Sequence, residues 1–232
     1  MRLFCFHYAG GGPHVFREWA DKLPVSIDVC CVHLPGRGAR LHEAPYDNLA
    51  ALIDALHSAL RPYFEKPYAF FGHSMGSILS FELAHQIRRE NGTPPVHLFL
   101  SGRPGPQRPV KRPHICGLPE ADFITELGRY GGTPEELLGN FELIKMMMPT
   151  LRADFSICEN YSYSGQPPLD CPISAFGSLE DPDVSRESLE TWRLETTSSF
   201  SVHMFPGNHF YLQTAQRLLL QVLSREMYKY IK

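Results

Sequence analysis

The sequence has no long hydrophobic run, no excess of positive charge and no paired cysteine motif. No apolar stretch among its 232 residues approaches the length that crosses a membrane. The first residues, Met1 to Phe6, lack the long apolar region and the cleavage site of a signal peptide. A formal net charge of -3 argues against nucleic acid as a main partner. We therefore expect a cytoplasmic protein that works neither on nucleic acid nor in a membrane.

The cysteines do not suggest a metal site or a disulfide framework. None of the six forms a pair with the spacing of zinc ligands, and three lie in apolar, strand-like runs. We expect them to be reduced and mostly buried, as is usual in cytosolic proteins. They are Cys5, Cys30, Cys31, Cys116, Cys158 and Cys171.

Strand-like and helix-like segments alternate along most of the chain. This alternation predicts an α/β fold with a mostly parallel central sheet that carries helices on both faces. A length of 232 residues suits one such domain, residues 1–232, with a segment inserted in it. Strands are expected at 2–8, 25–34, 68–72, 96–101, 172–177 and 200–206, and helices at 48–64, 75–91, about 184–197 and about 212–229.

The alternation breaks in the middle of the chain. Residues 102–118 are rich in proline and read as a loop, and helix-like pieces follow around 119–129, 134–148 and 150–158. An all-helical insertion of this kind, residues 115–162, predicts a helical lid over a site. Its methionines, Met146 to Met148, suit either a flexible apolar ligand or ordinary packing of the lid onto the core.

A Gly-x-Ser-x-Gly motif stands at the centre of the pattern. It spans Gly72 to Gly76, follows an apolar strand-like run and directly precedes an amphipathic helical run. This is the sequence form of a strand, a sharp turn and a helix, with Ser74 at the apex as a nucleophile. The alternative is that Ser74 only caps the following helix.

A serine nucleophile needs a base and an acid, which in this architecture follow it in the order acid, then histidine. His209 comes just after the last expected strand, whereas His203 lies within it. His73 is too close to Ser74 along the backbone to act as its base, so we expect it to pack beside the turn. Asp181 is the preferred acid and Asp183 the next choice; Glu180 and Asp170 lie nearby.

The developing oxyanion needs backbone N–H donors. One is expected from Met75, the residue after the nucleophile. The other should come from the glycine-rich loop after the first strand, with Ala9 preferred and Gly10 possible. The loop is not a phosphate cradle, since no Gly-x-x-x-x-Gly-Lys follows it.

Taken together, these motifs resemble those of the type II thioesterases, editing hydrolases of the α/β-hydrolase superfamily. The resemblance covers nearly the full length and rests on several motifs. They are Phe6 to Gly11, Leu34 to Gly38, Phe71 to Gly76, Leu151 to Phe155, Asp181 to Val184 and Phe205 to Phe210. The family often has proline at position 7 and glycine at position 208, where this chain has His7 and Asn208.

The resemblance implies hydrolysis of acyl thioesters on the phosphopantetheine arm of carrier domains, without metal or organic cofactor. Such an enzyme removes stalled or aberrant acyl groups during nonribosomal peptide, polyketide or fatty-acid synthesis, and we expect a monomer. A carboxylesterase or lipase for small esters would use the same triad. A hydrolase-fold module that only binds a synthase is the non-enzymatic alternative.

Carrier domains are usually acidic, so the resemblance also implies a basic docking surface. Arginines and a lysine cluster in two loops, which either dock the carrier or are ordinary solvated residues. They are Arg103, Arg108, Lys111 and Arg112 before the expected lid, and Arg37 and Arg40 after the second strand.

Overall fold

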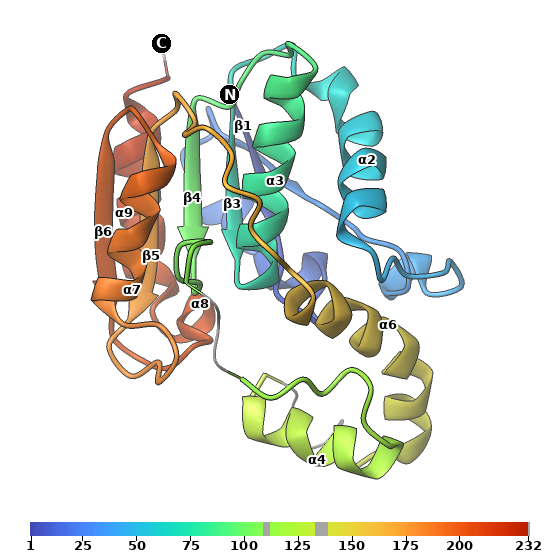
Figure 1. Cartoon of the computed structure of the whole chain (residues 1–232). Coiled ribbons are helices and arrows are strands. Elements are labelled where there is room, and N and C mark those ends of the chain that lie inside the picture. The colour runs from blue at the N-terminus through green and yellow to red at the C-terminus, as the bar shows by residue number, and fades with distance from the viewer. Residues whose placement is uncertain (109–111, 133–138, 232) are drawn as a thin grey trace.

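The computed structural model describes residues 1–108, 112–132 and 139–231. Six parallel strands form one sheet in the order β2-β1-β3-β4-β5-β6 (Figure 1). The chain runs from β1 outward to β2 and then returns past β1 to β3, so the strand order reverses beside β1. Ligands of parallel α/β sheets bind at the carboxyl ends of the strands near such a reversal. The strands are β1 Arg2–Phe6, β2 Asp28–Cys31, β3 Tyr68–His73, β4 His97–Ser101, β5 Ile173–Ser178 and β6 Phe200–Phe205.

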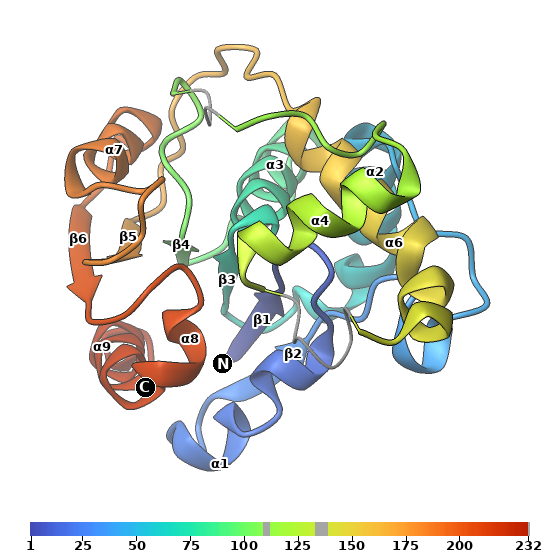
Figure 2. The ribbon, with the colours of Figure 1, turned by 90° about the horizontal axis from the view of Figure 1, so that it is seen from below.

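Helices cover both faces of the sheet, which confirms the predicted architecture. Helices α2 (Leu49–Leu60), α3 (Met75–Arg89) and α7 (Arg186–Glu190) pack on one face. Helices α1 (Trp19–Lys22), α8 (Tyr211–Thr214) and α9 (Gln216–Tyr228) pack on the other (Figure 2). Successive strand residues alternate between the two cores, so the inner strands are buried on both sides and read as continuous apolar runs.

The expected strands and helices agree with the structure to within a few residues, and several are shorter or divided. The expected helix at 184–197 consists of α7 and a 3-10 turn, Thr191–Glu195, and the C-terminal helix is divided into α8 and α9. Further 3-10 turns are Pro13–Phe16, Gly38–Arg40 and Arg61–Tyr63. Ser185 caps α7, because its hydroxyl accepts the N–H of Ser188.

A helical segment is inserted between β4 and β5. It contains α4 (Glu120–Tyr130) and α6 (Phe141–Glu159), which share a separate hydrophobic core and lie across the carboxyl-end side of the sheet (Figures 1 and 2). The expected separation at Pro149 is wrong, because α6 continues through this proline. The proline removes one helix hydrogen bond, but apolar side chains before and after it pack into the same core. Residues 134–138 of the expected helix lie outside the described part.

No helix in residues 1–108, 112–132 and 139–231 is both long and apolar enough to span a membrane. The same residues contain no group of three or more His, Cys, Asp or Glu side chains placed to hold a metal ion.

Candidate active site

Ser74 occupies a sharp turn between β3 and α3. Its backbone has φ 56° and ψ −109°, a region that a residue with a side chain adopts only when its surroundings impose it. A Cβ at position 72 would lie 2.0 Å from the carbonyl oxygen of Gly76, and one at position 76 would lie 2.1 Å from that of Phe6. Both glycines are therefore required by close backbone contacts. The Ser74 side chain makes no capping hydrogen bond, which disfavours the helix-cap interpretation.

His209 and Asp181 meet at the ends of two neighbouring strands. The Nδ1 of His209 lies 2.6 Å from Oδ2 of Asp181, and the carboxylate side chain is fully buried. Main-chain hydrogen bonds join the two loops, since the N–H of Glu180 donates to the carbonyl of Gly207. The second Asp181 oxygen accepts the N–H of Asp183. This carboxylate is thus held in place to orient the imidazole.

The other acidic candidates have different surroundings. Asp183 pairs with Arg112, and Glu180 is exposed. Asp170 precedes β5 and therefore lies at the opposite end of the sheet from His209. Within the described residues, Asp181 is the carboxylate that contacts His209.

His73 forms a neutral wall beside the candidate site, as its position in the motif predicts. Its Nδ1 lies 2.8 Å from Oγ of Ser101, and that hydroxyl lies 2.5 Å from the Tyr211 hydroxyl. Its ring centroid is 5.1 Å from that of His209. Burial lowers the pKa of His73 well below its ordinary value, so the ring stays uncharged at neutral pH. No sequence signal pointed to Ser101 or Tyr211.

His203 does not take part in this group of contacts. Its ring packs edge-on against Phe176, and it does not line the cavity that Ser74 and His209 share.

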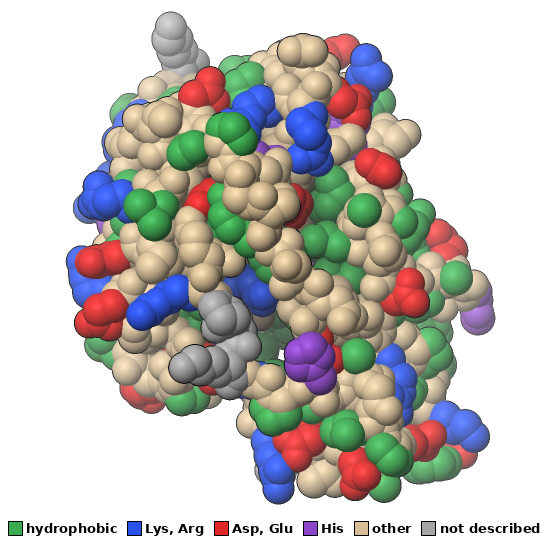
Figure 3. Space-filling model, in the orientation of Figure 1, with side chains coloured by type: hydrophobic (Ala, Val, Ile, Leu, Met, Phe, Trp, Pro, Cys, Tyr) green, Lys and Arg blue, Asp and Glu red, His purple; other side chains and the backbone are tan. Residues whose placement is uncertain are grey.

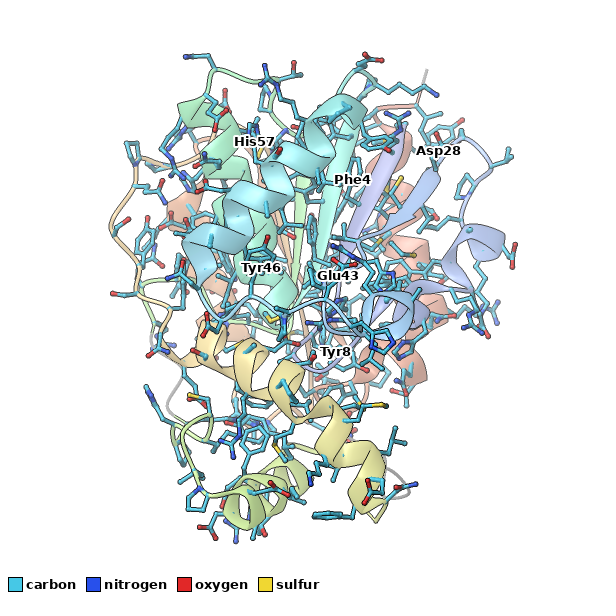
Figure 4. The ribbon with its side chains drawn as sticks, turned by 90° about the vertical axis from the view of Figure 1, so that its right-hand side faces the viewer. Phe4, Tyr8, Asp28, Glu43, Tyr46 and His57 are labelled. Atoms are coloured by element: carbon cyan, nitrogen blue, oxygen red, sulfur yellow. The ribbon has the colours of Figure 1, made fainter. Side chains whose placement is uncertain are left out.

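The glycine loop after β1 distinguishes between the two candidate oxyanion donors. The N–H of Gly10 donates to Oδ2 of Asp154 at 2.8 Å and is therefore occupied. Neither Ala9 nor Met75 has a hydrogen-bond partner for its N–H among the residues that the structure describes. Ala9 also lines the cavity, so the geometry favours Ala9 over Gly10. Figure 4 places the neighbouring Tyr8 at the end of the sheet that faces α6.

A buried ion pair fixes this loop, and the sequence did not reveal it. The guanidinium of Arg37 donates to both oxygens of Asp154, at 2.7 and 2.8 Å, and to the carbonyl of Gly11 at 3.2 Å. Both charged side chains are nearly inaccessible to solvent. The pair joins the loop after β1, the loop after β2 and helix α6. Both residues lie in sequence motifs that the chain shares with type II thioesterases. Neither motif indicates that the two side chains form a pair.

The expectation that Arg37 and Arg40 contribute to a docking surface is wrong for Arg37 and unsupported for Arg40. Arg37 is buried against Asp154. Arg40 pairs with Glu43 and also donates to the carbonyl of His33. Basic and acidic side chains are interspersed over the face shown in Figure 3.

A cavity of about 250 Å³ lies between the sheet and the inserted segment, and Ser74 and His209 both line it. Its apolar lining comes mainly from α4, α6 and aromatic residues of the adjoining loops. These residues are Tyr8, Leu127, Tyr130, Leu151, Phe155 and Phe210. None of the three methionines, Met146 to Met148, is among the residues that line it. Met148 is buried in the core of the inserted segment, Met147 contacts it and Met146 is exposed.

The described arginines of the proline-rich loop lie at this cavity, and Arg108 among them is also exposed to solvent. Arg103, Arg108 and Arg112 all line it. Arg112 pairs with Asp183 and lies over the Tyr130 ring, 4.1 Å from its centroid. The remaining member of the expected cluster, Lys111, lies outside the described residues.

The sequence of the chain is similar to those of known thioesterases and biosynthetic proteins. Residues 1–226 match the family model of the thioesterase domain. The chain is 43% identical to the gramicidin S biosynthesis protein GrsT of Aneurinibacillus migulanus over 227 residues, covering 98% of this chain and 89% of that protein. It is 45% identical to linear gramicidin dehydrogenase LgrE of Brevibacillus parabrevis over 232 residues, covering 99% of this chain and 88% of that protein.

Solved structures show the same similarity. The fold superposes with a TM-score of 0.89 on the RedJ thioesterase from the prodiginine biosynthetic pathway of Streptomyces coelicolor. The two are 40% identical, and the match covers 97% of this chain and 85% of that one.

Proposed function

The chain belongs to the thioesterase domain family, and from this premise we propose that it is a type II thioesterase that acts on carrier-bound acyl groups. Members of this family are serine hydrolases that cleave thioesters, and this chain is such an enzyme. In the proposed role, it removes stalled or aberrant acyl groups from the phosphopantetheine arms of nonribosomal peptide or polyketide synthases. Relatives named for gramicidin S biosynthesis and for the prodiginine pathway support this role.

The proposed catalytic residues act in two steps. His209 accepts the proton of Ser74 as the serine oxygen attacks the thioester carbonyl, and Asp181 holds the imidazole in the tautomer that can do so. The N–H groups of Ala9 and Met75 donate to the oxyanion. His209 then gives this proton to the departing sulfur, and the thiol leaves readily because its pKa is about 8.5. In the second step His209 takes a proton from water as the water attacks the acyl-serine, and it returns this proton to the Ser74 oxygen when the acid is released.

One observation carries the proposal. The His209–Asp181 contact of 2.6 Å stands beside the strained serine turn, and both the serine and the histidine line the same largely apolar cavity. A space of about 250 Å³ holds an acyl group and is far too small for a carrier domain. The carrier would therefore remain outside and deliver its acyl group on the flexible arm.

We propose that the inserted segment, residues 115–162 of the single domain 1–232, acts as a lid on this cavity.

We further propose a monomer that works in the cytoplasm, where its six free cysteines would stay reduced. Light scattering after size-exclusion chromatography tests the monomer.

A panel of acyl-loaded carrier domains tests the proposed function. We expect mass spectrometry to show loss of the acyl mass after incubation with the enzyme, faster than hydrolysis of an oxygen ester of the same acyl group. Faster turnover of the oxygen ester would favour the carboxylesterase alternative, since the same triad serves both reactions. No turnover of either, together with no labelling of Ser74 by a fluorophosphonate probe, would favour a binding module.

A further inference from the structure

Arg103 is a cation in the wall of the acyl cavity. It follows β4 by two residues, and the carbonyl of Ser101 at the end of that strand accepts the N–H of Ser74 at 2.7 Å. Its own backbone is fixed, since the indole N–H of Trp192 donates to the Arg103 carbonyl at 2.8 Å. The guanidinium carbon lies 5.6 Å from the ring centroid of Tyr161, which also lines the cavity. The backbone of Arg103 therefore follows the strand end that holds Ser74, and both residues line the same cavity.

This guanidinium has no anionic partner in the described part of the chain. Its side chain makes no hydrogen bond or ion pair with residues 1–108, 112–132 or 139–231. The two carboxylates that line the cavity in the described part of the chain have other partners. Asp183 pairs with Arg112, and Glu159 accepts the N–H groups of Ile115 and Cys116.

The groups nearest to the guanidinium are neutral. Burial raises the pKa of Cys158 to about 12, and burial also raises the pKa of Tyr161 above its ordinary value. Burial lowers the pKa of Arg103 itself, but an arginine remains protonated at neutral pH. The guanidinium makes a cation–π contact with the Tyr161 ring, and its N–H groups have no acceptor among the described residues. Arg103 is partly buried in the cavity wall, so a ligand that supplies an acceptor to these N–H groups would stabilise its charge.

We propose that Arg103 is a specificity-determining residue that binds an anionic oxygen group of the substrate, first of all a carboxylate at the end of the acyl chain. The planar fork of donors matches a carboxylate in two parallel hydrogen bonds. The phosphodiester of the pantetheine arm carries the same kind of oxygen and is the other source of such an anion. This inference rests on the proposed thioesterase function and names its substrate class.

Four thioester substrates show whether Arg103 binds the carboxylate of the acyl chain or the phosphate of the arm. They are the glutaryl and pentanoyl thioesters of pantetheine, which lacks the phosphate, and of phosphopantetheine. Glutaryl and pentanoyl chains have the same number of carbons and differ in the terminal carboxylate. We expect wild-type kcat/KM to favour glutaryl, and Arg103→Gln to lower the glutaryl-to-pentanoyl ratio at least tenfold. Arg103→Lys should retain part of the preference, because it keeps the charge and loses the fork.

The control is Arg217→Gln on α9, which removes an exposed arginine from the opposite face of the sheet and should leave the ratio and the rates unchanged. If Arg103→Gln changes only the ratio between phosphorylated and unphosphorylated arms, the anion site holds the arm. If folded Arg103→Gln enzyme changes neither ratio, the inference is wrong while the thioesterase function stands. If the wild type cleaves none of the four, and none of the acyl-loaded carriers, the proposed function itself fails.

Discussion

Asp181 and Asp183 stand two positions apart in one loop and have different partners. The side chain of Asp181 is buried and lies against the imidazole of His209, whereas that of Asp183 pairs with Arg112 from the loop before the inserted segment. The sequence left both open as the triad acid, since both follow the same strand. Only the fold decides which carboxylate reaches the histidine ring.

Substitution of each aspartate tests this assignment. Asp181→Asn should lower kcat about 10⁴-fold, because an amide no longer stabilises the imidazolium or the required tautomer. Asp183→Asn should lower kcat less than tenfold, since this residue pairs with an arginine at the cavity wall. Steady-state kinetics on one acyl thioester measures both. Equal losses in the two variants would contradict the assignment.

Gly76 tests the geometry of the serine turn. Gly76→Ala should lower the free energy of unfolding by about 2 kcal/mol or more, because the new methyl group would meet the Phe6 backbone, which cannot rotate away. Gly117→Ala is the matched control, since a Cβ there meets no described atom within 4 Å. Urea unfolding measures both variants. A Gly76→Ala protein as stable as the control would show that the turn is less constrained than described.

At the scale of the elements, the Arg37–Asp154 pair connects the inserted segment to the loop that carries the proposed oxyanion donor. Asp154 belongs to α6, and its carboxylate also holds the N–H of Gly10 beside Ala9. The position of α6 and the direction of the Ala9 N–H are therefore set by one group. We infer that Asp154 is a positioning residue for the oxyanion donor.

Asp154→Asn should lower kcat by about 10- to 100-fold with a smaller change in KM, since a misplaced oxyanion donor affects the transition state most. It should also cost about 3 kcal/mol of stability, because Arg37 would stay buried without its counter-charge. The double variant Arg37→Met, Asp154→Leu should recover stability, but kcat should stay low. Recovery of both quantities in the double variant would show a purely structural role.

The sequence predicted the regular elements well and the long-range contacts poorly. Short apolar runs indicated all six strands, and the inner strands show them most clearly because they are buried on both faces of the sheet. The chemistry of the Gly-x-Ser-x-Gly turn indicated Ser74, and the loop positions after the last two strands indicated acid and base. The Arg37–Asp154 pair could not be predicted, since its partners are 117 positions apart and each motif fits a solvated role. The continuity of α6 through Pro149 depends on packing, which local propensity does not contain.

At the scale of the whole molecule, buried neutral histidines couple stability to pH. Burial lowers the pKa of His7 to about 4, assisted by the charge of Arg37. Burial likewise lowers the pKa of His97 to about 4. His97 lies in β4, where its Nε2 is 2.8 Å from Oγ of Ser174, and its ring stacks on Phe99. The folded state therefore binds protons at these positions less readily than the unfolded chain.

The free energy of unfolding should fall as the pH is lowered from 6.5 toward 4. In this window the unfolded chain is protonated at each histidine and the folded protein is not, so acid favours unfolding. With a pKa of about 4 in the folded state, each histidine contributes a loss of about 2 kcal/mol between pH 7 and pH 5. Urea unfolding at the two pH values measures it. His97→Gln should reduce the loss by about 2 kcal/mol, and an unchanged loss would contradict this account.

The central claim is that the acyl group passes from the thioester to Ser74. Rapid quenching of the wild-type enzyme with an acyl-loaded carrier domain, followed by digestion and mass spectrometry, tests it directly. We predict the acyl mass on the peptide that contains Ser74, and neither the adduct nor thioester cleavage in Ser74→Ala. Cys158, whose thiol also lines the cavity, should carry no acyl group, because its raised pKa keeps the thiol protonated. An acyl group on Cys158, or undiminished cleavage by Ser74→Ala, would contradict the account.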